Sequence, residues 1–199
     1  MNLHGIVAPY IGTVNPLIDV SVQLSVGAVT NTDFTTSPGY STPGSFTGAI
    51  SNGVLTVSAV ASGVLGAGDT VAGVDVLPDT EIVSQLSGTA GGPGTYRLSR
   101  TQPDVVAAEA MTSALIMSAQ VQPMTWQDLR QVEGLNLSGT RRKIYLYGSV
   151  DSVNRVSRGG GDLITIANGG VDDGVWLVAQ VIEQFPDWVS AAMTLQNEG

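Results

Sequence analysis

Few residues in this chain could catalyse a reaction or hold a metal. Cysteine is absent, and His4 is the single histidine among 199 residues. Catalysis by an imidazole needs a positioned partner, and the residues around His4 offer none. Zinc sites take Cys and His ligands, which one histidine cannot supply. The sequence therefore predicts a protein that is not an enzyme and that carries no cofactor or metal.

Carboxylates are the next candidates, because 17 acidic residues outnumber 8 basic ones. Asp172 and Asp173 lie in a run rich in Gly, and such turns can bind Ca²⁺ through oxygen ligands. The spacing matches no EF-hand loop, and a tight turn is the simpler interpretation. An alternative is that acids line a channel, and the candidates are Asp151, Asp162, Asp172 and Asp173.

One basic cluster and three tryptophans are best suited to contact another protein chain. Trp and Arg are enriched at interfaces, and charges there help to set register. We expect the basic cluster to pair with acids of a neighbouring subunit, with phosphate contact as the alternative. The tryptophans together with Phe185 could mark a sugar-binding platform, but their positions on a helix and on the closing strands more often mean a core or an interface. The interface candidates are Arg141, Arg142, Lys143, Trp126, Trp176 and Trp188.

The overall charge argues against binding to nucleic acid. The net charge is −9, and no part of the chain is basic, whereas tight phosphate binding needs clustered Lys and Arg. Charged residues make up only 13% of the chain, and none occurs from Phe34 to Gly68. So few charges protect a monomer poorly against association, which favours a subunit covered by neighbours. No apolar run is long enough to span a membrane, and no signal-peptide pattern opens the chain. We therefore expect assembly in the cytoplasm.

Alternating apolar and polar residues predict β-strands towards both ends of the chain. One helix is expected at about residues 126–133, with Thr125 and Asp128 as a pair resembling a capping box and Gly134 as its stop. Residues 30–44 are rich in Pro and Gly without periodicity, and this indicates a linker. The predicted strands cover residues 18–26, 115–121, 144–148, 162–166, 175–182 and 188–195.

The middle of the chain has a different pattern, with short strands and frequent turns. Strands are expected around residues 55–59, 80–86 and 96–98, separated by Gly, Pro and Asn. This spacing is typical of a compact all-β sandwich or barrel. We predict an all-β protein in which a β-sandwich at residues 43–112 is inserted into a host barrel of residues 1–42 plus 113–199.

The inserted segment resembles a β module found in many virion proteins of tailed bacteriophages. The resemblance covers residues 45–111, about a third of the chain. It rests on the opening SFTG, the run LTVSAVASGVL, the turn GAGDTVAG, the corner VLPDTEI and the hairpin GGPGTY. It implies a structural protein of a phage particle.

A second resemblance covers residues 113–196. The short helix, GTRRKIYLYG, DLITI and VWLVAQVIEQFPDWV look like the small SH3-like barrels of phage neck proteins. These head-closure, stopper or collar subunits join the portal complex to the tail. The resemblance implies a ring, most simply a hexamer, between a portal or adaptor protein and the tail tube or tail terminator. DNA would pass through without specific binding.

The alternative is a tail or baseplate fitting whose inserted module binds a host-surface glycan. Both readings place the protein in the virion. If the protein lies at the neck, the sequence assigns no defined role to the inserted module.

Overall fold

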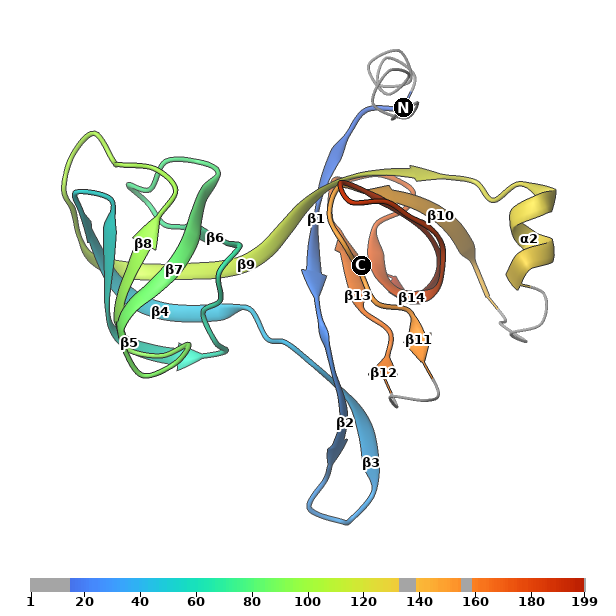
Figure 1. Ribbon diagram of the computed structural model, residues 1–199, viewed down its shortest axis with the longest axis horizontal. Coiled ribbons are helices and arrows are strands. Elements are labelled where there is room, and N and C mark those ends of the chain that lie inside the picture. Colours follow the sequence, from blue (N-terminus) through green and yellow to red (C-terminus); the bar gives the residue numbers. More distant parts are fainter. Residues whose placement is uncertain (1–14, 133–138, 155–158, 199) are drawn as a thin grey trace. The chain divides into compact units, whose positions relative to one another are not determined.

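The computed structural model describes residues 15–132, 139–154 and 159–198, and almost all of their regular secondary structure is β-strand (Figure 1). The chain divides into two compact units. We call Ser41–Ile116 the continuous unit. We call Met1–Tyr40 with Met117–Gly199 the split unit, because two separate stretches of chain build it. No helix in the described ranges is long and apolar enough to cross a membrane.

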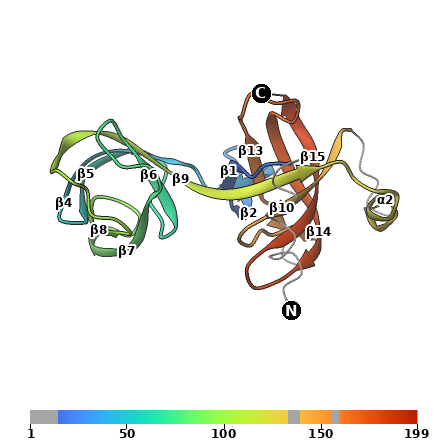
Figure 2. The same cartoon turned by 90° about the horizontal axis from the view of Figure 1, so that it is seen from above.

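Six described strands of the split unit form a closed antiparallel barrel (Figure 2). Each strand pairs with the next, and the last pairs with the first, so the barrel has no free edge. The register places Ile144 between Ala191 on one side and Val121 on the other. In order, the strands are β1 (Ile18–Gln23), β13 (Leu163–Ile166), β14 (Gly174–Gln184), β15 (Val189–Glu198), β10 (Arg141–Leu146) and the C-terminal part of β9 (Val106–Gln122).

The barrel core follows from the alternation along its strands. Trp176 and Val178 alternate with partly buried neighbours in β14, and Ile164 and Ile166 do the same in β13. The start of β15 is buried on both faces of the strand, and residues 191–194 there are all small or apolar. Burying one such large side chain contributes about 1.5–3 kcal/mol. The predicted strands 162–166, 175–182 and 188–195 are confirmed in position, with small shifts of their ends.

The continuous unit is also closed, which corrects the predicted sandwich. Its strands form one ring of hydrogen bonds and not two facing sheets. The long strand β9 makes this possible, because its N-terminal part pairs on both sides: Ser113 lies opposite Gly44 and opposite Val71. The order is β4 (Gly44–Ser51), β5 (Val54–Ser62), β8 (Gly94–Leu98), β7 (Thr80–Gly88), β6 (Asp69–Ala72) and β9, which returns to β4.

The continuous unit has its own apolar core. Every other residue of β4 points inward, as the period of a strand requires. Phe46 and Ile50 from β4 meet Leu55 from β5 and Ile82 from β7. The remaining buried members of this core are Val57, Leu65, Val71, Tyr96, Leu98, Val106 and Met111.

A β-hairpin lies where the sequence indicated a linker. β2 (Ser25–Thr30) pairs with β3 (Thr36–Tyr40), so the predicted strand 18–26 is in fact two strands interrupted at Leu24. In the turn, the Asn31 amide donates to the Thr35 carbonyl at 2.8 Å, and the Phe34 amide donates to the Asn31 carbonyl at 3.0 Å. Pairing of this kind needs no apolar alternation, which is why the linker prediction was wrong. A second small hairpin, β11 (Val153–Asn154) with β12 (Gly159–Gly160), contacts β2.

The single described helix is α2 (Trp126–Val132), and its predicted start is confirmed. The Thr125 amide and hydroxyl donate to Asp128 Oδ2 at 2.9 and 2.7 Å. The Asp128 amide donates to the Thr125 hydroxyl oxygen at 3.3 Å. This reciprocal arrangement is a capping box with Asp in the third position. Gly134, the predicted stop, lies outside the described residues.

Candidate subunit interface

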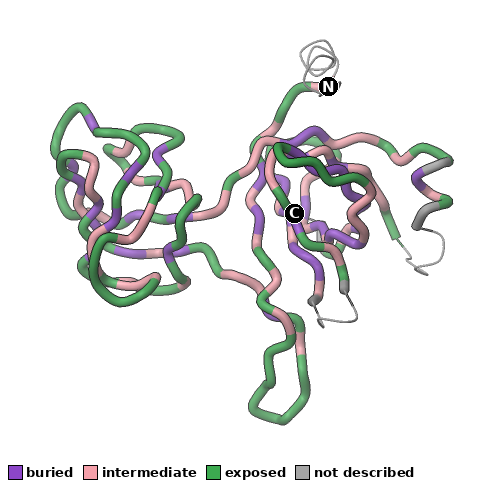
Figure 3. Tube along the Cα trace, viewed as in Figure 1, coloured by how far each residue is buried: buried purple, intermediate pink, exposed green. Residues whose placement is uncertain are grey.

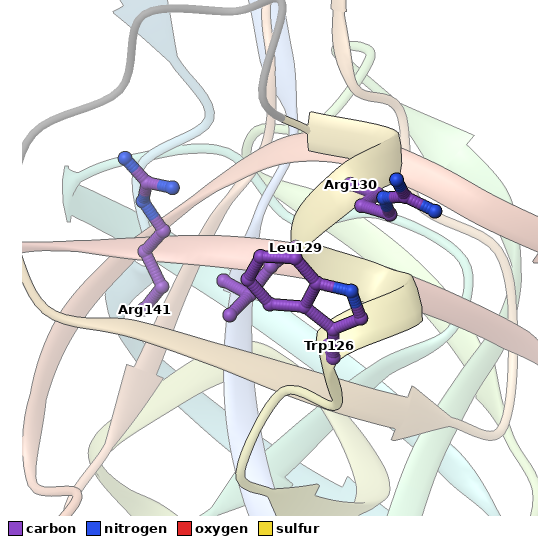
Figure 4. Close-up of a pocket in the computed structure, with 4 residues that line it drawn as sticks. All are labelled: Trp126, Leu129, Arg130 and Arg141. Carbon is purple, nitrogen blue, oxygen red and sulfur yellow. The ribbon is translucent and has the colours of Figure 1, made fainter.

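A pocket of about 190 Å³ lies between α2 and β10 in the split unit (Figure 4). Trp126, Leu129 and Arg130 line it from the helix, and Arg141 lines it from the first position of β10. In Figure 4 the indole of Trp126 and the side chain of Leu129 lie between the two arginines. The pocket thus combines an apolar floor with two cationic sides.

Trp126 is the exposed aromatic of this site, with 71% of the residue open to solvent. Arg130 follows one turn later, and its guanidinium carbon is 5.9 Å from the indole centroid. A cation–π contact at an exposed site contributes only about 0.5–1 kcal/mol. That gain is small beside the apolar surface that Trp126 leaves in water. Trp126 therefore leaves a large apolar surface exposed in its own unit.

A partly buried ion pair fixes α2 to the barrel. Lys143 Nζ lies 3.0 Å from Asp128 Oδ1, and the two side chains are only 13% and 8% exposed. Burial raises the pKa of Asp128, but hydrogen bonds from Thr125 and from Lys143 outweigh burial and lower it overall. Burial lowers the pKa of Lys143, but Asp128 and Tyr145 outweigh burial and raise it overall. Both groups are held in their charged forms, and the helix is held at the pocket.

The three residues of the basic cluster have different surroundings. Arg142 Nε donates to Asp172 Oδ1 at 2.7 Å, so its charge is paired within the unit. Lys143 is paired with Asp128. Arg141 differs, because its Nε is buried and has no hydrogen-bond partner among the described residues. The pairing of this cluster with a neighbouring subunit stays a prediction, and within the unit only Arg142 and Lys143 have acidic partners among the described residues.

Two of the three candidate tryptophans belong to the core. Trp176 is 1% exposed, and its indole N–H donates to the Asp172 carbonyl oxygen at 2.8 Å. Trp188 is 7% exposed and stacks on Phe185 with ring centroids 4.4 Å apart. Neither ring is available to another chain. Of the two open interpretations, core holds for these two, and Trp126 alone of the three is exposed.

Asp162 is buried inside the split unit and does not line a channel. It is 1% exposed, and its carboxylate accepts the Ser25 and Asp151 backbone amides, each at 2.7 Å. Burial raises the pKa of Asp162, and these two amides partly offset that rise. The channel prediction is wrong for Asp162, because its carboxylate joins two segments of the unit. Asp151 is itself exposed, and its backbone takes part in this junction.

Asp172 and Asp173 stabilise a turn. The Asp173 carboxylate accepts the amides of Asn168, Gly169 and Gly170 at 3.0, 2.9 and 3.2 Å. These hydrogen bonds lower the pKa of Asp173, with the Asn168 amide contributing most. Asp172 is neutralised by Arg142. The carboxylate of Asp173 therefore acts as the tight-turn interpretation expects, whereas that of Asp172 pairs with a residue outside the turn.

The described residues hold no group of three His, Cys, Asp or Glu side chains that could bind a metal ion. His4 lies outside the described residues. Sequence reasoning missed Leu129 and Arg130. Their spacing of three and four residues from Trp126 on a predicted helix was the signal that could have found them, since such residues share a helix face.

Comparisons with known proteins found no matching family model, no matching curated protein and no matching solved structure.

Proposed function

We propose that this chain is a structural subunit of a tailed-phage particle, which forms a ring at the neck between head and tail. The ring joins a portal or adaptor protein to the tail tube or terminator and surrounds the DNA channel. The sequence resemblances support this proposal. The two closed β units are suited to it, because closed sheets expose no edge that would pair with the wrong partner.

The observation that carries the proposal is the pocket around Trp126. An exposed Trp beside two arginines has the composition of an interface hot spot, where a few anchors supply most of the binding free energy. A contact between this pocket and a different surface of a second copy joins unlike surfaces of the two copies. Such heterologous contacts close into a ring when the rotation between copies divides a full turn. Six copies match a six-fold tail.

The charge of the chain suits a DNA channel. At a net −9, the subunit repels a phosphate backbone, and two of its basic residues, Arg142 and Lys143, are paired with acids of the same unit. DNA passes such a surface without being held. In this proposal the inserted unit is an addition to the ring, and assembly of the ring does not require it.

The test is a Trp126→Ala variant of the full chain, with Val171→Ala as its control. Val171 is 96% exposed in the same unit and is not one of the residues that line the pocket. Because Trp126 is exposed, its removal should leave thermal unfolding almost unchanged. Loss of a hot-spot Trp should weaken assembly about 30-fold or more, seen by sedimentation alone and with connector proteins. The control should assemble normally.

Localisation in particles provides the second readout. Antibody or gold labelling should mark the neck in electron micrographs. Labelling at the tail tip would refute the neck assignment and favour the glycan-binding fitting. A wild-type chain that stays monomeric and binds no connector protein would refute the ring itself.

A further inference from the structure

The tip of the β2–β3 hairpin presents a large apolar side chain to solvent. Phe34 is 90% exposed, and the tube in Figure 3 is mostly coloured as exposed along this hairpin. Val26 and Val29 on β2 are 63% and 46% exposed. These apolar side chains are left uncovered by the unit that carries the hairpin. A two-stranded hairpin by itself is at best marginally stable in water.

Phe34 also occupies an unfavourable backbone conformation. Its φ is +64°, in the left-handed region that Gly and Asn adopt readily and bulky residues seldom do. A turn selected only for its shape would have Gly or Asn here. The presence of Phe where both backbone and solvent disfavour it points to a role for the phenyl ring itself.

A carboxylate lies beside this ring in the sequence. Asp33 Oδ1 accepts the Thr35 amide at 3.1 Å and the Thr35 hydroxyl at 2.6 Å. The hydrogen bond from the Thr35 hydroxyl, and then that from the Thr35 amide, lower the pKa of Asp33. The tip therefore offers an oriented, ionised carboxylate next to an exposed phenyl ring.

The α2–β10 pocket is complementary to that pair of groups. Its volume of about 190 Å³ suits a phenyl ring, since an apolar cavity of about 150 Å³ is enough to bind benzene. Trp126 and Leu129 supply the apolar surface, and Arg130 and Arg141 flank it. Arg130 and Arg141 are opposite in charge to a carboxylate, and a carboxylate that arrives beside the phenyl ring would meet these two cations.

The hairpin and the pocket lie apart within the split unit. Figures 1 and 2 both show β2 and α2 at separate places on the barrel. The tip of one chain therefore reaches such a pocket only on another chain. We propose that Phe34 and Asp33 of one copy dock into the Trp126–Arg141 pocket of a second copy. This inference rests on the proposed function, and it names the contact that builds the ring.

Cross-linking tests the pairing directly, because the chain has no native cysteine. Thr32→Cys places a thiol at the tip, and Thr140→Cys places one beside the pocket, without removing Phe34, Asp33 or Arg141. Mixing the two single variants with a short bifunctional thiol reagent should give a dimer that contains one of each. Thr32→Cys alone should give almost none. Self-cross-linking of Thr32→Cys, or no mixed product in a sample shown to be oligomeric, would overturn the proposal.

A charge exchange tests the chemistry of the contact. Asp33→Arg and Arg141→Asp should each weaken self-association by about tenfold or more, since close interfacial charge pairs couple strongly. The double variant should recover most of that loss. Asp75→Arg, which changes the charge equally at an exposed position of the continuous unit, is the matched control and should associate normally. A double variant as weak as the sum of both singles would contradict direct pairing.

A Phe34→Gly variant separates the loss of the phenyl ring from a loss of folding. Gly accepts the left-handed conformation, so this variant should melt no lower than the wild type yet lose association. Rings that persist in Phe34→Gly and Asp33→Arg would refute the docking inference and leave the proposed function standing. Mixed cross-links in a protein that labels away from the neck would refute the proposed function and leave the docking inference standing.

Discussion

The ion pair between Asp128 and Lys143 is the contact that places the pocket, and Asp128→Asn tests it. The substitution keeps the side-chain shape and one acceptor for the cap at Thr125. It removes the charge that faces Lys143 and places an amide donor where a carboxylate oxygen accepted. Lys143, whose side chain is only 13% exposed, then has a poorly solvated charge without its counter-ion.

The magnitude follows from burial and from the number of hydrogen bonds. Breaking a fully buried ion pair costs about 3–5 kcal/mol, and losing one hydrogen bond to a charged group costs about 1.5–3 kcal/mol. The Asp128–Lys143 pair is nearly but not completely buried, and Asn retains part of the cap. We expect the free energy of unfolding of the split unit to fall by about 2–3 kcal/mol at neutral pH.

The dependence on pH gives a second signature. The pKa of Asp128 in the folded chain lies below its ordinary value of 3.8. Its stabilising contribution is therefore fully present above pH 3.8 and is lost as the pH falls through the folded pKa. The difference in stability between wild type and Asp128→Asn should be largest near neutral pH and should shrink in acid.

Urea unfolding followed by tryptophan fluorescence is the appropriate assay. The three tryptophans, Trp126, Trp176 and Trp188, all belong to the split unit, so their emission follows that unit alone. Asp187→Asn, at an exposed position of the same unit, is the matched control and should change stability by less than about 0.5 kcal/mol. A loss below about 0.5 kcal/mol in Asp128→Asn, or a loss that stays constant in acid, would refute the reasoning.

Two further predictions concern the architecture. Asp162→Asn should lower the stability of the split unit by about 1–3 kcal/mol, because an amide cannot accept from both the Ser25 and Asp151 backbone amides; wild-type urea resistance in this variant would contradict that role. Residues 41–116, expressed alone, should unfold cooperatively by far-UV circular dichroism, because the continuous unit has a closed sheet and its own core. A gradual melt without a transition would show that this unit depends on the rest of the chain.

Local patterns predicted part of the structure well. The strands β13 and β14 were found from short apolar runs bounded by Gly and Asp residues, a pattern typical of buried strands. The start of α2 was found because the capping pair is three residues apart. The β2–β3 hairpin was missed, because Thr36–Tyr40 is stabilised by backbone pairing and carries no apolar alternation.

The candidate site was predicted only in part, because the partners of its residues lie far from them in the sequence. Arg141, Arg142 and Lys143 are consecutive, and their sequence context is nearly identical. Their roles differ because Asp172 reaches Arg142 and Asp128 reaches Lys143, across 30 and 15 residues, while Arg141 Nε meets no acceptor in the part of the chain that the structure describes. No local pattern encodes which cation meets an acid in the fold.

Composition and periodicity were sufficient to establish an all-β chain with one capped helix, since strand period and capping act over a few residues. Tertiary structure decided how the sheets close. Val106–Gln122 pairs on both sides within each unit, and this turns a predicted sandwich into a barrel. It also decided that Trp126 is exposed while Trp176 and Trp188 are buried. Closure and burial depend on strands that are far apart in sequence and meet only when the chain is folded.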